Sequence, residues 1–129
     1  MKSATAEQEK TLPQLRVIAR GHVRPGKEED ARGLFRSMLA PTRAEPGCIF
    51  YEYYESAPSG GNFFANQAPT DTRMEIYFDE LWTDQAAQDA HAQTPYFARL
   101  KAGLTAVIDG DYHVVNLMEV DPVGRAGIT

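Results

Sequence analysis

The spacing of apolar residues in this chain switches repeatedly between the two-residue period of a β-strand and the longer period of an α-helix. Strand-like alternation runs from Gln14 to Arg24, through the aromatic segment Cys48 to Glu55, and again from Arg73 to Trp82. A last strand is expected over Tyr112 to Val120. Helical spacing separates the first strand from the second and the third from the fourth. The predicted order of elements is therefore β-α-β-β-α-β.

The two helical segments carry signals for their ends and for interruptions. The first begins with an acidic turn at Glu28, and Pro41 is expected to kink its last turn before Pro46-Gly47 ends it. The second is expected to use Thr83 as its N-cap. Pro95 should divide this second segment into two shorter helices, the first of them reaching Gln93.

This order of elements predicts an α+β, ferredoxin-like fold, in which one antiparallel four-stranded sheet has helices on one face. The other face of such a sheet has no helix to cover it. Val17 and Ile18 in the first strand, like Phe50 and Tyr53 in the second, place apolar or aromatic side chains on both faces. We expect a second copy of the chain to cover the open face, which predicts a homodimer.

The length of 129 residues accommodates one domain, which we expect at residues 14–121. The polar residues 1–13 are expected to form a disordered N-terminal tail, and residues 122–129 a loose C-terminal tail. A long connection, Ala57 to Thr72, lies inside the domain. Loops of this length within compact domains are often functional, so we expect a lid or a dimer contact there.

Composition excludes several classes of partner. The net charge is −5 and no cluster of Lys and Arg is present, which argues against binding to nucleic acid or to an anionic membrane. One cysteine cannot form an internal disulfide or a multi-cysteine metal site. The three histidines have no metal-ligand spacing, and no glycine-rich nucleotide motif is present, so neither a metal nor a cofactor is expected. No apolar run has the length of a signal peptide or membrane span, so a cytoplasmic location is expected.

Three segments of the chain resemble the antibiotic biosynthesis monooxygenase family. They are Pro41 to Tyr54, Glu80-Leu81-Trp82, and Ala90 to Phe97, and the resemblance covers about residues 14–121. It implies a dimeric α+β barrel with a mostly apolar pocket between helices and sheet in each subunit. Members of this family include cofactor-independent monooxygenases of quinols and anthrone-like polyketides, haem-degrading oxygenases, and an isomerase of a phosphorylated sugar.

The resemblance can be tested against two subgroups. Haem-degrading members pair an Asn on the first strand with a Trp and a His on the helices. In this chain the matching stretch of the first strand is Ala19 to Gly21, which contains no Asn. The Trp position falls on His91, and the His position falls near Lys101. Haem degradation is therefore not expected. The polyketide oxygenases carry an Asn where this chain has Phe78, and the family's Thr-Pro-His-Phe appears here with Tyr96 in place of the histidine.

Two residues are candidates for acid–base catalysis. His91 is the candidate base, because imidazole exchanges protons near neutral pH and the small side chains around it leave space for a ligand. The alternative is a histidine that packs between helices and bonds a backbone carbonyl. Glu80 shares a strand face with Trp82, and a semi-buried carboxylate there could have a raised pKa and hold the imidazole or a substrate hydroxyl. The alternative is structural, with Glu80 bonded to the helix cap and Trp82 filling the core.

The expected ligand contacts are mostly aromatic. They are Tyr51, Tyr53, Phe78, Trp82, Tyr96 and Phe97. Tyrosine hydroxyls could stabilise an oxyanion, although a strand rich in tyrosine is also typical of a half-buried interface. Arg20 could bind an acidic group of the substrate, or it could be solvated at the barrel rim.

The resemblance implies a cofactor-free monooxygenase that acts on a small phenolic or quinol-like aromatic substrate and O2, and the chemistry of the candidate residues is compatible with this reaction. His91 would remove a phenolic proton, and the resulting anion would pass an electron to O2 without flavin or metal. Two alternatives remain. One is an isomerase or tautomerase that uses the same base without oxygen, and the other is a non-catalytic, stress-related dimer that binds a small ligand.

Overall fold

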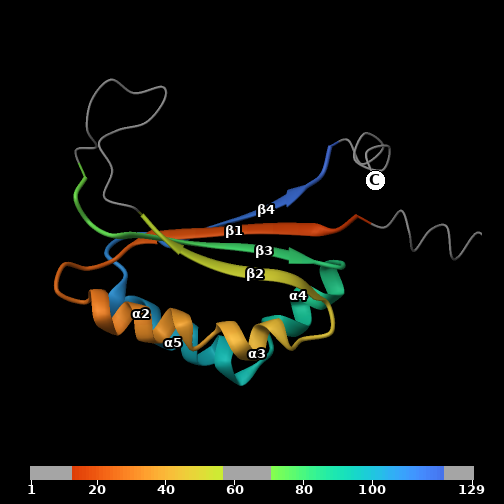
Figure 1. The fold of residues 1–129 in the computed structure, drawn as a ribbon, viewed down its shortest axis with the longest axis horizontal. Helices are drawn as coiled ribbons and strands as arrows, with labels where there is room; N and C mark the ends of the chain where they lie inside the picture. Colours follow the sequence, from red (N-terminus) through yellow and green to blue (C-terminus); the bar gives the residue numbers. More distant parts are fainter. Residues whose placement is uncertain (1–12, 57–70, 121–129) are drawn as a thin grey trace, which may run out of the picture.

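The computed structural model describes residues 13–56 and 71–120 (Figure 1). Their elements, in chain order, are β1 (Leu15–His22), α2 (Glu28–Arg36), α3 (Leu39–Arg43), β2 (Cys48–Glu55), β3 (Glu75–Trp82), α4 (Gln85–His91), α5 (Pro95–Val107) and β4 (His113–Met118). The two expected tails and nearly all of the Ala57 to Thr72 connection lie outside the described residues.

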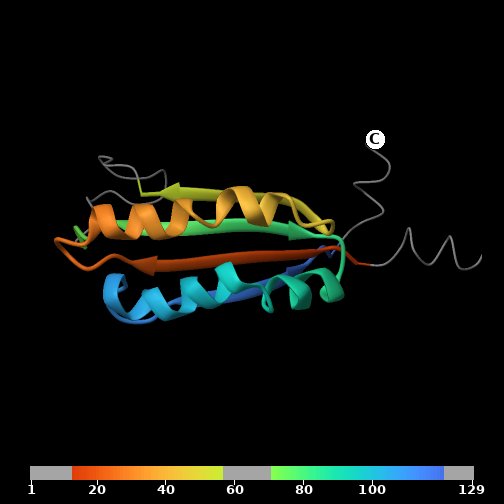
Figure 2. The same ribbon diagram turned by 90° about the horizontal axis from the view of Figure 1, so that it is seen from below.

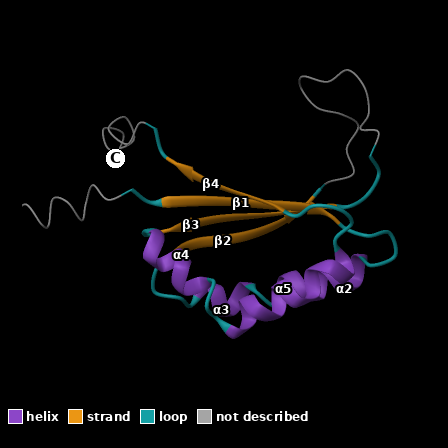
Figure 3. Cartoon of the chain, turned by 180° about the vertical axis from the view of Figure 1, so that it is seen from behind, coloured by secondary structure: helices purple, strands orange, loops and turns teal. Residues whose placement is uncertain are grey.

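The four strands form one antiparallel sheet in the order β2-β3-β1-β4. All of the helices lie on one face of it, in two rows: α2 with α3, and α4 with α5 (Figures 2 and 3). This arrangement confirms the predicted ferredoxin-like fold. Within residues 13–56 and 71–120 the opposite face carries no helix, and β4 diverges from the helical layer towards its end (Figures 1 and 3).

The core lies between the sheet and the two rows of helices. Its largest members include Trp82, Phe78 and Ile76 from β3, which lie at alternate positions on the inward face, in agreement with the strand-like alternation predicted over Arg73 to Trp82. Phe35 from α2 packs edge-on against Phe78, with 5.6 Å between the ring centroids. This aromatic packing fixes β3 and β2 against the first row of helices, and side chains from these strands also form part of the candidate site.

The first helical segment consists of two helices rather than one kinked helix. The break falls at Ser37 and Met38, where the Ser37 hydroxyl donates to the Leu34 carbonyl at 2.6 Å. Pro41 consequently lies in the first turn of α3, where backbone N–H groups have no partner inside the helix and a missing one costs little. The interruption therefore falls one turn before the expected position, at Ser37, whose carbonyl would have accepted the amide hydrogen bond that Pro41 cannot donate.

The second helical segment begins one residue later than expected. Asp84, not Thr83, is the N-cap of α4, and its carboxylate accepts a hydrogen bond from the Ala87 amide at 2.9 Å. The Thr83 amide instead donates to the Gly47 carbonyl at 2.9 Å, which ties it to the turn before β2. Helix α4 ends at His91 rather than Gln93.

Proline and threonine separate α4 from α5 as expected. Thr94 is the N-cap of α5 and accepts from the Phe97 amide at 3.2 Å, while Pro95 takes the first helical position, where its missing N–H is not needed. Strands β1, β3 and β4 are shorter than their patterns suggested, and β4 covers His113–Met118 rather than Tyr112 to Val120. Tyr112 therefore lies in the connection before the strand.

Gly47 allows the turn before β2 to approach α4 closely. A Cβ atom at Gly47 would lie 2.2 Å from the Ala87 Cβ, whereas one at Gly33, in α2, would meet nothing within 4 Å. We expect Gly47→Ala to lower the free energy of unfolding by about 1–3 kcal/mol, because the added methyl overpacks this contact. The matched Gly33→Ala variant should raise it by about 0.5–1 kcal/mol, since alanine is the better helix former. Urea unfolding of both variants measures the difference, and equal effects would contradict the packing described.

Candidate functional site

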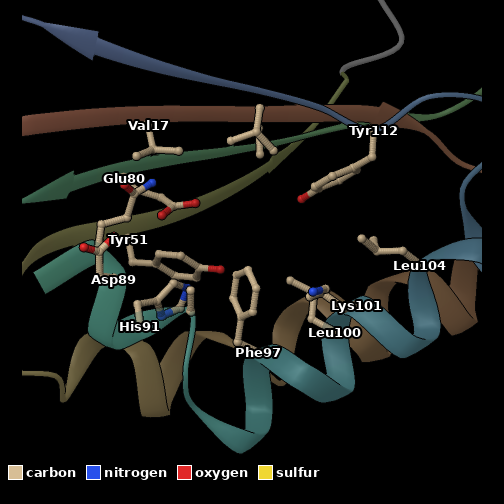
Figure 4. Close-up of a pocket in the computed structure, with 14 residues that line it drawn as sticks. Val17, Tyr51, Glu80, Asp89, His91, Phe97, Leu100, Lys101, Leu104 and Tyr112 are labelled. Carbon is tan, nitrogen blue, oxygen red and sulfur yellow. The ribbon is translucent and has the colours of Figure 1, made fainter. Parts of the chain in front are cut away.

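A cavity of about 440 Å³ lies between the sheet and the second row of helices, α4 and α5 (Figure 4). Its apolar walls are formed by Val17, Ala19, Phe97, Leu100, Leu104 and Val114. This size and lining are typical of sites for small organic ligands.

Small residues on the inward face of β1 create the space. Where Val17 and Val23 fill the core, Ala19 and Gly21 present almost no side chain. The ring of Tyr112 lies over Gly21, since a Cβ added there would be 3.0 Å from the tyrosine Cδ1. A larger residue at either small position would therefore fill the cavity or displace the Tyr112 ring.

Polar groups enter the apolar cavity from opposite ends. At one end are the side chains of Tyr51, Glu80 and His91, and at the other the hydroxyl of Tyr112 points inward from the connection before β4 (Figure 4). A few polar groups converging inside an apolar cavity is the arrangement expected of a site that orients a ligand.

His91, on the last turn of α4, is held by a carboxylate. Its side chain is buried, and Nδ1 lies 2.8 Å from Glu45 Oε2. In the part of the chain that the structure describes, Nε2 has no hydrogen-bond partner. A carboxylate at Nδ1 favours the tautomer with its proton on that nitrogen, which leaves Nε2 as a proton acceptor. The partner is thus a carboxylate rather than the backbone carbonyl of the structural alternative.

Aromatic rings fix the plane of the imidazole. The ring centroid of His91 lies 4.8 Å from that of Trp82 and 5.1 Å from that of Phe97. The Tyr51 ring is 5.7 Å away. With Glu45 on one nitrogen and rings on its faces and edge, the side chain has little freedom to rotate, which is what a positioned base requires.

Glu45 binds a second residue besides His91. The Tyr96 hydroxyl donates to the same Glu45 oxygen, Oε2, and lies 3.4 Å from the Pro41 carbonyl oxygen. Burial raises the pKa of Tyr96 to about 12, and the bond to Glu45 adds to the shift, so the phenol remains protonated. Tyr96, which replaces the family's histidine, therefore anchors Glu45.

Glu80 is a buried carboxyl whose protonation changes near neutral pH. Its side chain accepts a hydrogen bond from Trp82 Nε1 at 2.9 Å and is 7% exposed. Burial raises the pKa of Glu80 to about 7, and the charges of Asp79 and Glu45 add to this, whereas the bond from Trp82 opposes it. Its partner is the indole, not the helix cap. Near neutral pH this group can therefore either donate to or accept from a ligand oxygen.

The two tyrosines of the cavity are neutral hydrogen-bond donors. Burial raises the pKa of Tyr51 and of Tyr112 well above the ordinary value, and the nearby charge of Glu80 contributes to both shifts. Each hydroxyl therefore keeps its proton and can stabilise an oxygen that gains negative charge.

The other predicted residues lie away from the cavity wall. Trp82 and Phe78 belong to the core behind it, and the Tyr53 hydroxyl donates to Glu55 at 2.7 Å. Arg20 lies on the open face of the sheet, with Nη1 3.6 Å from Glu75. The structure thus brings together His91, Glu80, Tyr51 and Phe97, and it does not bring Tyr53 or Arg20 to the same place.

Glu45 and Tyr112 are polar residues of the site that were not predicted from the sequence, and neither were Lys101 and Asp89 in the cavity lining. Glu45 lies inside the segment that carried the family resemblance, directly before the Pro46-Gly47 turn. A carboxylate at a turn is usually solvated, so only its position in that segment could have identified it. Tyr112 was expected to be the first residue of a strand, and nothing in its pattern showed that its hydroxyl turns inward.

Within residues 13–56 and 71–120, no three His, Cys, Asp or Glu side chains lie close enough together to hold a metal ion. Burial raises the pKa of the Cys48 thiol to about 11, and the charge of Glu45 adds to the shift, so this cysteine is not activated as a nucleophile. Among the helices that the structure describes, none is long and apolar enough to span a membrane.

Comparison with known proteins identifies relatives with the same fold. "Putative monooxygenase Rv0793" of Mycobacterium tuberculosis is 30% identical over 105 residues, which are 81% of this chain and 90% of that protein. Its solved structure matches with a TM-score of 0.69 and 29% identity over 85% of this chain and 98% of that one. The structure of PA3566 from Pseudomonas aeruginosa matches with a TM-score of 0.65 and 28% identity, over 85% of this chain and 96% of that one.

A second sequence relative is longer than this chain. "Uncharacterized protein sll1783" of Synechocystis sp. is 37% identical over 75 residues, which are 58% of this chain and 42% of that protein, so the match spans less than half of its length. The family model described as "Antibiotic biosynthesis monooxygenase" matches residues 14–103, which include β1 and the cavity residues from Val17 to Lys101. This chain belongs to the antibiotic biosynthesis monooxygenase family.

Proposed function

We propose that this protein is a cofactor-independent monooxygenase of a small phenolic, quinol-like or anthrone-like aromatic compound. The observation that carries the proposal is the buried His91, whose Nδ1 binds Glu45 while its Nε2, beside an apolar cavity, has no partner among the described residues. Family membership, and a relative named as a monooxygenase, support oxygen chemistry as the reaction class.

The first step of the proposed reaction is removal of a proton from the substrate. A flat aromatic ligand lies against Phe97 and the apolar walls, with its hydroxyl directed to His91 Nε2. His91 takes the phenolic proton, or from an anthrone-like substrate one proton of the CH2 carbon, which gives the corresponding phenolate-type anion, and the Glu45 carboxylate stabilises the imidazolium that forms. The neutral hydroxyl of Tyr51 donates to the oxygen on which negative charge develops.

The second step is oxidation of the electron-rich anion by O2. When a CH2 carbon of an anthrone-like substrate becomes a carbonyl, the carbon loses four electrons and both hydrogens. One oxygen atom enters the carbonyl, and the other accepts the two hydrogens and leaves as water. The substrate supplies every electron, so the balance needs no external reductant. The apolar cavity limits access of water to the reactive anion.

The requirement for oxygen tests the reaction class. Purified, metal-stripped protein is incubated with anthrone, hydroquinones and naphthalenediols in air and under argon. We expect one O2 consumed per product in air, above the spontaneous rate, and no product under argon. Equal turnover under argon would support the isomerase alternative, and binding without turnover would support the non-catalytic one.

We further propose that the protein acts as a homodimer joined through the open face of the sheet. On this face Leu117 and Val115 of β4 are 44% and 49% exposed, and Tyr54 of β2 is 54% exposed. Arg16 and Asp79 form a two-bond ion pair at 2.6 and 2.7 Å beside them. Exposed apolar side chains around a satisfied ion pair are the composition expected of an interface between copies.

The dimer is tested by measuring mass in solution. Light scattering of the wild type should give about 29 kDa, the mass of two chains of 14.3 kDa each. Leu117→Glu should shift micromolar samples to the monomer, because it buries an unpaired charge in the interface. Ala98→Glu, on the exposed side of α5, adds the same charge and should leave the dimer intact. A monomeric wild type would contradict the proposal.

A further inference from the structure

The two ends of the cavity differ in charge. At the His91 end the cavity is lined by two carboxyl groups, Glu80 and Asp89 (Figure 4). At the opposite end Tyr112 and Lys101 contribute a phenol and an ammonium. One end therefore offers proton acceptors, and the other chiefly offers hydrogen-bond donors and a positive charge.

Lys101 is a cation that remains available to a ligand. It lies on α5, one residue after the buried Leu100, and it lines the cavity. Many basic side chains of this protein are paired, such as Arg16 with Asp79 and Arg73 with Asp71. For Lys101, by contrast, no ion pair or hydrogen bond is formed with any of the residues described. An unpaired ammonium beside an apolar cavity is suited to bind an anionic group.

Tyr112 supplies a second donor at the same end. Its hydroxyl points into the cavity and makes no hydrogen bond to another described residue (Figure 4). Burial raises its pKa, so it remains a neutral donor. The position of its ring depends on Gly21, which has no side chain to displace it. A carboxylate placed between the Lys101 ammonium and this hydroxyl would satisfy both.

We propose that the cavity selects aromatic hydroxy acids, with the ligand carboxylate bound by Lys101 and Tyr112 and the phenolic hydroxyl at His91. The position of the hydroxyl rests on the proposed function, whereas the selection of an acid rests on the charges of the lining. The reverse orientation would place the ligand carboxylate beside Glu80 and Asp89, where like charges repel.

Calorimetric titration with three matched naphthalenes tests this selection at equilibrium. The probes are 6-hydroxy-2-naphthoic acid, its neutral carboxamide and 2-naphthol. At low salt and pH 8 we expect the acid to bind about tenfold more tightly than the amide, as one charge-assisted hydrogen bond would give. This preference should decrease as the salt concentration rises, because part of it is Coulombic.

Single substitutions test which residues cause the preference for the acid over the amide. Lys101→Met should abolish the difference between acid and amide and leave the affinity for 2-naphthol unchanged, whereas Lys101→Arg should keep the difference. Tyr112→Phe should reduce it severalfold. Arg99→Met removes a charge from an exposed position of the same helix, away from the cavity, and should have no effect.

Equal binding of acid and amide by the wild type, or a preference that survives Lys101→Met, would overturn the inference, as would a failure of all three naphthalenes to bind. Oxygen uptake is measured separately on the same samples. Selective binding of the acid without oxygen uptake would support the selection of hydroxy acids and contradict the proposed oxygenase. Oxygen uptake without selective binding would support the oxygenase and contradict the selection of hydroxy acids.

Discussion

Replacing His91 with alanine should lower kcat/KM for oxygen-dependent turnover by about 10²–10⁴-fold, the usual contribution of a positioned general base. The buried ring lies at the cavity, with Nδ1 held by Glu45 and Nε2 without a partner among the described residues. The loss should therefore appear in the proton-transfer step rather than in binding. Stopped-flow oxygen consumption measures it.

Two controls separate loss of the base from loss of the fold. Added imidazole should restore part of the activity of His91→Ala, because the small molecule can occupy the vacated space and accept the proton. Gln93→Ala, on an exposed residue just after α4, should retain full activity. Unchanged oxygen uptake by His91→Ala would contradict the assignment of His91 as the general base.

Glu45 should act through His91 as a positioning residue. We expect Glu45→Gln to lower kcat by about 10–100-fold with little change in KM, because the imidazole loses its carboxylate partner while the cavity walls remain. Tyr96→Phe leaves the carboxylate in place and should have a smaller effect. A change in KM alone would indicate that Glu45 only supports the shape of the cavity.

The second large effect concerns stability and pH. The folded-state pKa of Glu80, about 7, lies above its ordinary value of 4.5 because the carboxyl is buried. A raised carboxyl pKa means that the stabilising contribution of the protonated group is complete below pH 4.5 and is lost as pH rises through 7. Relative to Glu80→Gln, the wild type should therefore lose about 3 kcal/mol of unfolding free energy between pH 4.5 and pH 8.

Urea unfolding of both proteins at several pH values measures this difference. The glutamine amide oxygen can still accept from Trp82, so the variant isolates the ionisation of Glu80. The Glu29→Gln variant is the control, because that side chain is 86% exposed and its substitution should give a difference that stays within about 0.5 kcal/mol. If the difference in unfolding free energy between the wild type and Glu80→Gln did not change with pH, Glu80 would not ionise in a buried environment.

Much of the fold could be predicted because strand periodicity is local. The aromatic segment Cys48 to Glu55 gave a strand with the observed bounds, since Pro46-Gly47 marks its beginning. The residues that share the inward face of β3 could be predicted from the alternation of apolar residues along the strand. Pro41 predicted an interruption of the first helical segment, but not its position four residues earlier at Ser37, where the hydroxyl bond to Leu34 also competes with the helix.

The site was predictable only where its residues share an element or a family segment. Glu80 and Trp82 lie two residues apart on one strand, and their hydrogen bond follows from that spacing. The contact between Glu45 and His91 joins residues 46 positions apart, from the end of α3 to the end of α4. No periodicity relates these two positions, so the carboxylate that orients the base became visible only when the helices were placed against the sheet.

Cofactor-independent oxygenation at His91 is tested most directly by following the oxygen atoms. Metal-stripped wild-type protein and His91→Ala are incubated with anthrone under ¹⁸O2, and the product and O2 consumption are measured by mass spectrometry. We expect one ¹⁸O atom in each product molecule, one O2 consumed per product, and only the spontaneous rate in the variant. Product oxygen derived from water, or equal rates in both proteins, would contradict cofactor-independent oxygenation at His91.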